Sequence, residues 1–111
     1  MTIERKEDIQ KLENMTKSPE TYIRIEAKRW FQRSYGNTYH SCKVVLVSGI
    51  GEKYKREEIG YEPFSYGYES HYLNTAAKIL GVSEGSLRRF MMDSRGKVLE
   101  RVIDVDRKKD L

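Results

Sequence analysis

The chain has 111 residues, of which 38% are hydrophobic and 34% are charged. This length and composition predict one domain with one modest core and a strongly solvated surface. The 21 lysines and arginines outnumber the 17 acidic residues, and the resulting net charge of +4 mildly favours polyanionic partners. The single cysteine, Cys42, excludes an internal disulfide, and one cysteine with two histidines is too few for a structural zinc site.

The first residues, MTIERKEDIQKLE, lack the apolar stretch of an export signal, and no segment approaches the roughly 18 apolar residues of a membrane span. We therefore expect a cytoplasmic protein with no membrane partner. The abundance of lysine, arginine and glutamate, with few prolines, also suits a thermophilic source.

We expect one domain over residues 1–111. Its first segment, 1–18, is open to two interpretations. Ile9 and Leu12 lie at helical spacing, which favours a short amphipathic helix. The many charges around them equally favour a frayed arm. The sequence KSPE then ends the segment.

Residues 21–61 predict a β-hairpin and sheet, because the apolar period changes to two. One face receives Ile23, Ile25, Ala27 and Phe31, and the opposite face receives charged side chains and Trp30. The turn sequence SYGNT and the β-branched run YHSCKVVLV complete the hairpin. The segment EKYKREEIGY follows as a highly charged third strand, which we expect at a sheet edge.

The second half predicts an aromatic loop over 61–72, a helix pair within 69–93 with Ser70 as candidate N-cap, a last strand over 98–105 and a flexible tail over 106–111. The fold class is therefore α+β. A small antiparallel β-sheet, made of the hairpin plus one or two further strands, would support a helix-turn-helix-like pair of helices.

The helix pair carries most of the functional signal. Gly81 stands where the first helix must end, because glycine accepts a positive φ. Ala77 is small enough to let the second helix approach, and Ser83 is a good N-cap for it. On a helical wheel one set of side chains faces inward: Leu87, Phe90 and Met91. The outward set is Gly85, Arg88, Arg89 and Met92.

Residues 73–92 resemble the helix-turn-helix motif of DNA-binding proteins in the small residue Ala77, the turn at Gly81 and the apolar spacing around it. The resemblance implies that the second helix enters the major groove of DNA. It assigns nucleic-acid contacts to Ser83, Glu84, Ser86, Arg88 and Arg89. A plain helix corner covering the sheet, with both arginines merely solvated, needs the same glycine and the same spacing.

A second resemblance covers residues 29–80. The segments RWFQRSYGNTYHS and YGYESHYLNTAAKIL are similar to segments of small uncharacterised phage and plasmid proteins. The similarity implies a setting, an accessory protein of a virus, plasmid or other mobile genetic element, but it brings no chemistry. It also suggests that the hairpin, rather than the helix pair, is the defining part of the chain.

The hairpin offers a different nucleic-acid surface. Aromatic residues interleave with cations around its turn, a pattern that can stack bases and hold the backbone of single-stranded nucleic acid. The aromatic members are Trp30, Phe31, Tyr35 and Tyr39, and the cationic ones are Lys28, Arg29, Arg33 and Lys43. The simpler interpretation is that Trp30 and Phe31 cap the core. The order of elements also matches double-stranded-RNA-binding domains, without their basic cluster.

We predict no enzyme, no catalytic residues, no metal and no cofactor. His40 and Cys42 lie two apart on one strand, but a nucleophilic pair needs a third orienting group. Asp104 and Asp106, with Lys108 nearby, would need a third acid to hold Mg²⁺ in a nuclease.

The leading hypothesis is a small protein, encoded by a virus or plasmid, that binds double-stranded DNA as a homodimer through the second helix. The alternative is a non-catalytic interaction module of a mobile element that binds a host or self protein. A continuous basic surface across Lys78, Arg88, Arg89 and Arg95 would favour DNA. Salt bridges that occupy both Arg88 and Arg89, or a second helix buried against the sheet, would favour the module.

Overall fold

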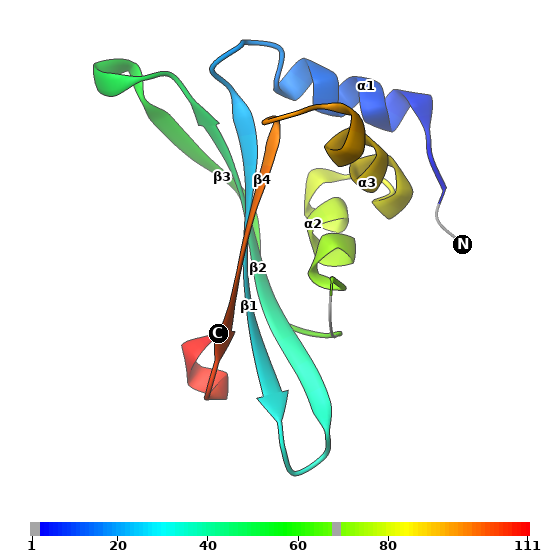
Figure 1. Cartoon of the computed structure of the whole chain (residues 1–111), viewed down its shortest axis with the longest axis vertical. Helices are drawn as coiled ribbons and strands as arrows, with labels where there is room; N and C mark the ends of the chain where they lie inside the picture. The colour runs from blue at the N-terminus through cyan, green and yellow to red at the C-terminus, as the bar shows by residue number, and fades with distance from the viewer. Residues whose placement is uncertain (1–2, 68–69) are drawn as a thin grey trace.

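A computed structural model describes residues 3–67 and 70–111, and Figure 1 shows a long twisted sheet with the helices gathered on one side of it. The elements in chain order are α1 (Lys6–Met15), β1 (Tyr22–Gln32), β2 (Asn37–Ser48), the 3₁₀ helix η1 (Gly51–Lys53), β3 (Lys55–Tyr66), α2 (Tyr72–Leu80), α3 (Glu84–Asp93), β4 (Val98–Val105) and the 3₁₀ helix η2 (Lys108–Asp110). The α+β class is confirmed.

The sheet has the strand order β3-β2-β1-β4. β1 and β2 form the predicted antiparallel hairpin, in which Tyr22 pairs with Val47 and Gln32 with Asn37. β3 continues the meander antiparallel to β2, with two register shifts. β4 occupies its predicted residues, but it runs parallel to β1 because the helix pair carries the chain back across the sheet. The sheet is therefore mixed and not wholly antiparallel.

The core lies between the sheet and the helices. Alternation on β1 places Ile23, Ile25 and Ala27 on this side, as predicted, and Cys42 and Val44 of β2 face the same way. From the helices, the core receives Leu12, Leu73, Ala76, Leu80, Leu87 and Phe90. We call this side of the sheet the helix face and the other side the open face.

Several elements differ from expectation at their ends. β3 extends to Tyr66, so much of the expected aromatic loop is strand, while residues 68–69 of that loop lie outside the described residues. α2 is preceded by His71 as N-cap residue, without a side-chain cap, where Ser70 was expected. Segment 1–18 contains a helix whose Leu12 is fully buried. Segment 106–111, expected to be a flexible tail, contains η2, which lies on the open-face side in Figure 1.

Each helix in the described ranges has ten residues or fewer, and none is long and apolar enough to cross a membrane.

Candidate nucleic-acid interface

The turn between α2 and α3 forms as its sequence predicts. Gly81 adopts a left-handed conformation with φ of 73°, and Val82 N donates a hydrogen bond to Ala77 O across the turn. Ser83 caps α3, with its hydroxyl oxygen accepting a hydrogen bond of 3.2 Å from Ser86 N. Local sequence chemistry alone accounts for this turn.

The N-terminal segment covers the beginning of α3. Ser83 donates its hydroxyl to Ile3 O, and Asp8 accepts a 2.8 Å hydrogen bond from Ser83 N. Gly85 is buried, although we predicted it to face outward. The backbone of Ile3 lies so close that a Cβ atom at Gly85 would be 2.6 Å from Ile3 O. Glycine is therefore needed for close approach of the backbone rather than for helix propensity.

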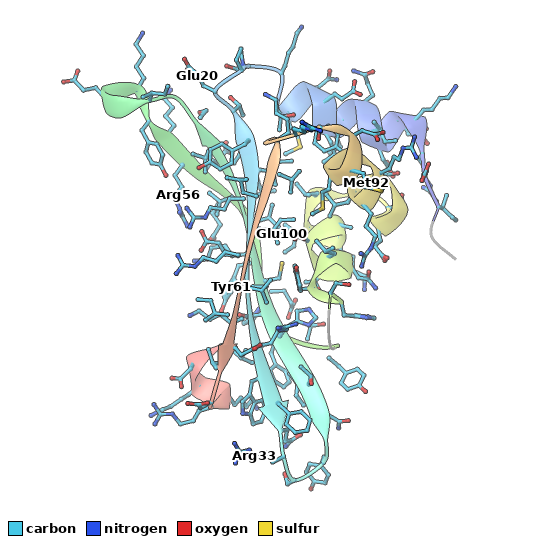
Figure 2. The ribbon with its side chains drawn as sticks, in the orientation of Figure 1. Glu20, Arg33, Arg56, Tyr61, Met92 and Glu100 are labelled. Atoms are coloured by element: carbon cyan, nitrogen blue, oxygen red, sulfur yellow. The ribbon has the colours of Figure 1, made fainter. Side chains whose placement is uncertain are left out.

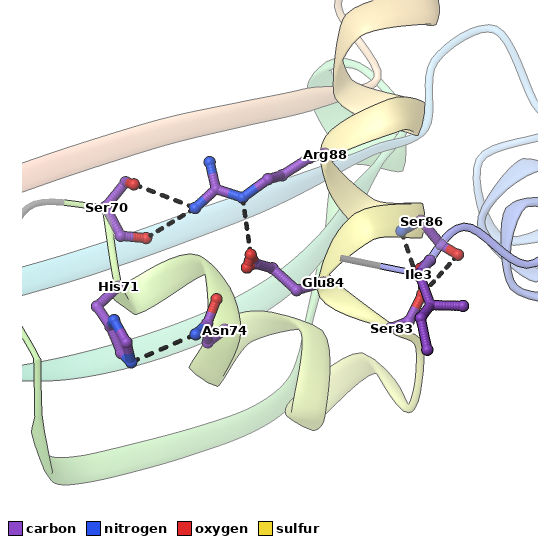
Figure 3. Close-up of polar contacts among 8 residues, drawn as sticks. All are labelled: Ile3, Ser70, His71, Asn74, Ser83, Glu84, Ser86 and Arg88. Atoms are coloured by element: carbon purple, nitrogen blue, oxygen red, sulfur yellow. Dashed lines mark hydrogen bonds and ion pairs between the residues drawn. The ribbon is translucent and has the colours of Figure 1, made fainter. Parts of the chain in front are cut away.

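Ser86 is 0% exposed, and its hydroxyl accepts a 2.7 Å hydrogen bond from Arg5 N. Ser83 and Ser86, the two serines expected to contact nucleic acid, thus use their hydroxyl groups within the molecule (Figure 3).

Both predicted arginines of α3 are occupied by carboxylates. Arg88 Nε lies 3.1 Å from Glu84 Oε1, and its guanidinium also donates to the Ser70 hydroxyl at 3.1 Å, which ties α3 to the start of α2 (Figure 3). Arg89 Nε lies 2.8 Å from Asp93 Oδ2, and its side chain is half exposed. The structure therefore brings Glu84 and Arg88 together, while Arg89 forms a separate surface pair.

The open face begins with a charged network above two buried valines. Val45 and Val47 are at most 1% exposed, although they point away from the helices. Glu26 bridges two arginines, at 3.3 Å from Arg24 and 2.8 Å from Arg56. The alkyl stems of such side chains cover apolar surface while their charges stay in water. The cross-strand neighbours of Val45 are Arg24 and Glu58, and those of Val47 are Tyr22 and Arg56.

Farther along the strands, cations gather around a hollow of about 300 Å³. Its cationic side chains are Lys28, Lys43 and Arg101, from three adjacent strands. One carboxylate, that of Glu26, lines the same hollow, together with Ser41, Tyr61, Ile103 and Leu111. Within the described ranges, Lys28 and Arg101 form no ion pair within 4 Å, whereas Lys43 lies 3.7 Å from Glu58. Figure 2 shows Tyr61 and Arg56 on the side of the sheet away from the helices.

Beyond the hollow, aromatic rings stack across the strands. Trp30 and Tyr39 have ring centroids 5.8 Å apart, and Tyr39 and Phe64 4.7 Å apart, both in stacked geometry. Tyr66 meets Tyr39 edge-on, and Lys108 of η2 lies 4.8 Å from the Phe64 centroid. Trp30 therefore belongs to an open-face cluster and does not cap the core.

The open-face strand positions carry more positive than negative charge. Five cations, Arg24, Lys28, Lys43, Arg56 and Arg101, accompany two carboxylates, Glu26 and Glu58. Together with the rings, they place positive charge and π-surface on one face, a combination found in proteins that bind single-stranded nucleic acid.

The groups considered for catalysis are placed differently. His40 is fully buried rather than half-buried, and burial lowers its pKa. Cys42 is also buried, which raises its pKa to about 12 and keeps the thiol protonated. Asp104 and Asp106 line one hollow with Arg29, and Asp104 pairs with Arg29 at 2.9 Å. In the described ranges, no three His, Cys, Asp or Glu side chains form a group that could hold a metal ion.

Several open-face residues were not predicted as site residues, among them Tyr61, Phe64, Tyr66 and Arg101. Tyr61 stood at the boundary between the expected third strand and the expected aromatic loop, and Phe64 and Tyr66 stood within that loop, which β3 occupies as far as Tyr66. Arg101 joins the cations only because β4 pairs parallel with β1, which places Arg101 opposite Glu26. The position of Arg101 within the expected strand 98–105 did not show which face of the sheet it would join, because that depends on the strand order.

No protein-family model matches the chain, and comparison with curated proteins and with solved structures also finds no match. The fold and the surface chemistry therefore define an α+β protein with a cationic and aromatic sheet face, and the functional argument rests on these residues.

Proposed function

We propose that the protein binds nucleic acid and that the open face of the sheet is the binding surface. The observation that carries the proposal is the convergence of Lys28, Lys43 and Arg101 on one hollow, with Lys28 and Arg101 having no carboxylate partner in the described ranges. Such cations attract phosphate groups and release condensed counterions on binding.

Binding through α3 stays a prediction that the geometry supports less well. A phosphate at Arg88 would have to replace both Glu84 and Ser70, and one at Arg89 would have to displace Asp93. Ser86 would first need the N-terminal segment to leave. Of the sheet cations, Lys43 would have to leave Glu58, but Lys28 and Arg101 need no such exchange, which favours the open face.

A second function, binding of a protein partner or of a second copy, is favoured by the ion pairs that occupy both Arg88 and Arg89 and by apolar exposure. Leu99 and Ile103 of the edge strand β4 are about half exposed, and they alternate with Arg101 on the open face. Sedimentation of the wild type and of Ile103→Lys over a range of concentrations tests this function. Self-association that the lysine abolishes would support it, whereas a monomer at every concentration would exclude the homodimer.

The nucleic-acid proposal is tested by binding of labelled single-stranded and duplex DNA at low and moderate salt. Two double variants remove the same charge: Lys28→Ala/Arg101→Ala on the sheet and Arg88→Ala/Arg89→Ala on α3. We expect the sheet variant to lose at least about tenfold in affinity and to lower the slope of log K against log salt by about 1.5, because two phosphate contacts disappear.

The arginine variant should bind like the wild type, provided that its far-ultraviolet circular dichroism shows a folded protein. Loss of binding in the folded arginine variant alone would move the site to α3. No salt-sensitive binding by the wild type would overturn the nucleic-acid proposal.

A further inference from the structure

We infer that the open face selects single-stranded over duplex nucleic acid, with phosphate held at the cationic hollow and bases held on the neighbouring rings. This inference rests on the proposed function and specifies its ligand. The structural basis is the arrangement of charge and rings along the strands, which places the two kinds of group side by side on one face.

The hollow and the ring stack are immediate neighbours. Lys28 precedes Trp30 by two residues on β1, and Ser41 follows Tyr39 by two residues on β2. Two residues on one face of a strand span about 7 Å. This span corresponds to about two nucleotides at the 3.4 Å rise of a stacked strand. One short segment of a single strand can therefore reach both the cations and the rings.

The rings keep surface available to a ligand. Tyr61 is 47% exposed at the rim of the hollow, with Lys43 Nζ 5.5 Å from its ring centroid. Phe64 is 39% exposed at the end of the stack, with Lys108 Nζ 4.8 Å from its centroid. Tyr66 is more exposed still, at 58%. A ring whose only role was to fill a core would be covered, whereas these rings are accessible beside cations.

Single-stranded nucleic acid satisfies both features, and a duplex satisfies only one. Unpaired bases can leave the strand and stack on aromatic side chains, which contributes affinity with little dependence on sequence. In a duplex the bases are already stacked inside the helix, so it would contact the cations and gain little from the rings. The rings should therefore contribute to the affinity for single strands and contribute little to the affinity for duplexes.

Trp30 supplies an intrinsic probe, because it is the only tryptophan in the chain and it lies at one end of the stack. A base that stacks near Tyr39 and Phe64 should quench its fluorescence, whereas a ligand held elsewhere by charge alone should leave the emission unchanged. The probe requires no label on the protein.

The experiment titrates the full chain with oligothymidylate, with oligouridylate and with a DNA duplex of equal length, following both anisotropy of the labelled strand and Trp30 emission. The variants are Tyr61→Leu and Phe64→Leu. The matched control is Tyr54→Leu, since Tyr54 is also half exposed and lies at the opposite end of β3. Thermal unfolding followed by circular dichroism verifies that each variant is folded.

We expect both single strands to bind more tightly than the duplex and to quench Trp30. Tyr61→Leu and Phe64→Leu should each weaken single-strand binding by about tenfold and leave duplex binding within twofold, while Tyr54→Leu changes neither. Equal binding of single strands and duplex, unaffected by the ring variants, would overturn this inference and leave the proposed function standing. Absence of binding to all three ligands would overturn both.

Discussion

The two faces of the sheet bury their apolar side chains by different means. On the helix face, Ile25 and Val44 pack against side chains of all three α-helices in one continuous core. On the open face, Val45 and Val47 are buried just as completely outside that core, with Arg24 and Arg56 among their cross-strand neighbours. The comparison teaches that a sheet face can be covered without a second layer, and that such a cover leaves charged groups at the surface.

The cations of the two faces also differ in what they contact. Some hold parts of the protein together, and others are available to a ligand. The guanidinium of Arg88 joins two helices, so it has a role within the protein. Lys28 and Arg101 line a hollow together with Glu26, and within the described ranges neither cation forms an ion pair within 4 Å. We therefore expect stability to depend mainly on the helix face and binding on the open face.

The largest effect is expected from truncation of the core. Leu87 of α3 is fully buried, so Leu87→Ala should lower the free energy of unfolding by about 2–5 kcal/mol. Lys28→Ala, on the open face, should change it by no more than about 0.5 kcal/mol. Urea unfolding followed by circular dichroism measures both. Similar losses in the two variants would show that the division between the faces is wrong.

A smaller effect on the free energy of unfolding is expected from pH, through His40 on the helix face of the sheet. His40 Nδ1 donates to Gly67 O at 3.3 Å, so Nε2 is the acceptor for the Thr75 hydroxyl at 2.7 Å, and burial lowers the pKa of the imidazole. The unfolded chain takes up the proton first. The free energy of unfolding should therefore fall below about pH 6.5, by up to about 1.4 kcal/mol per pH unit until the folded pKa is passed.

His40→Gln retains hydrogen-bonding groups and removes the titration, so it should flatten the pH dependence between about pH 6.5 and 5. Unfolding curves at several pH values test this. A wild type and variant with parallel pH profiles would mean that His40 is not the titrating group.

The smallest effect is expected for the exposed ion pair of α3. Arg89 and Asp93 are both half exposed and four residues apart, and such pairs contribute about 0.3–0.5 kcal/mol. Arg89→Ala should therefore change the free energy of unfolding by less than about 0.5 kcal/mol in low salt, and by less in high salt. A loss above about 1 kcal/mol would give Arg89 a structural role beyond the pair.

Local signals in the sequence predicted much of the fold. The alternation on β1, the turn before β2, the left-handed Gly81 and the bounds of β4 all depend on neighbouring residues, and each is confirmed. Such features follow from backbone preferences and from the period of apolar residues, which are visible in a single sequence.

Features that depend on distant parts of the chain were not predictable in this way. The parallel pairing of β4 with β1 brings Arg101 opposite Glu26, and no local pattern encodes the strand order. The burial of Gly85 depends on Ile3, which lies more than eighty residues earlier. The hairpin part of the candidate site, with Lys28, Lys43, Trp30 and Tyr39, was among the predicted surfaces. Its remaining members, Tyr61, Phe64 and Arg101, join it only through the pairing of β3 and β4 with the hairpin.

The measurement that tests the central claim most directly is lysine footprinting of the folded protein, with and without oligothymidylate, by acetylation and mass spectrometry. Lys28 and Lys43 line the open-face hollow, whereas Lys11 and Lys78 are exposed on the helices. The account predicts that bound nucleic acid protects Lys28 and Lys43 and leaves Lys11 and Lys78 reacting as before. Protection of Lys78 with no change at Lys28 would contradict it and place the ligand on the helix side of the molecule.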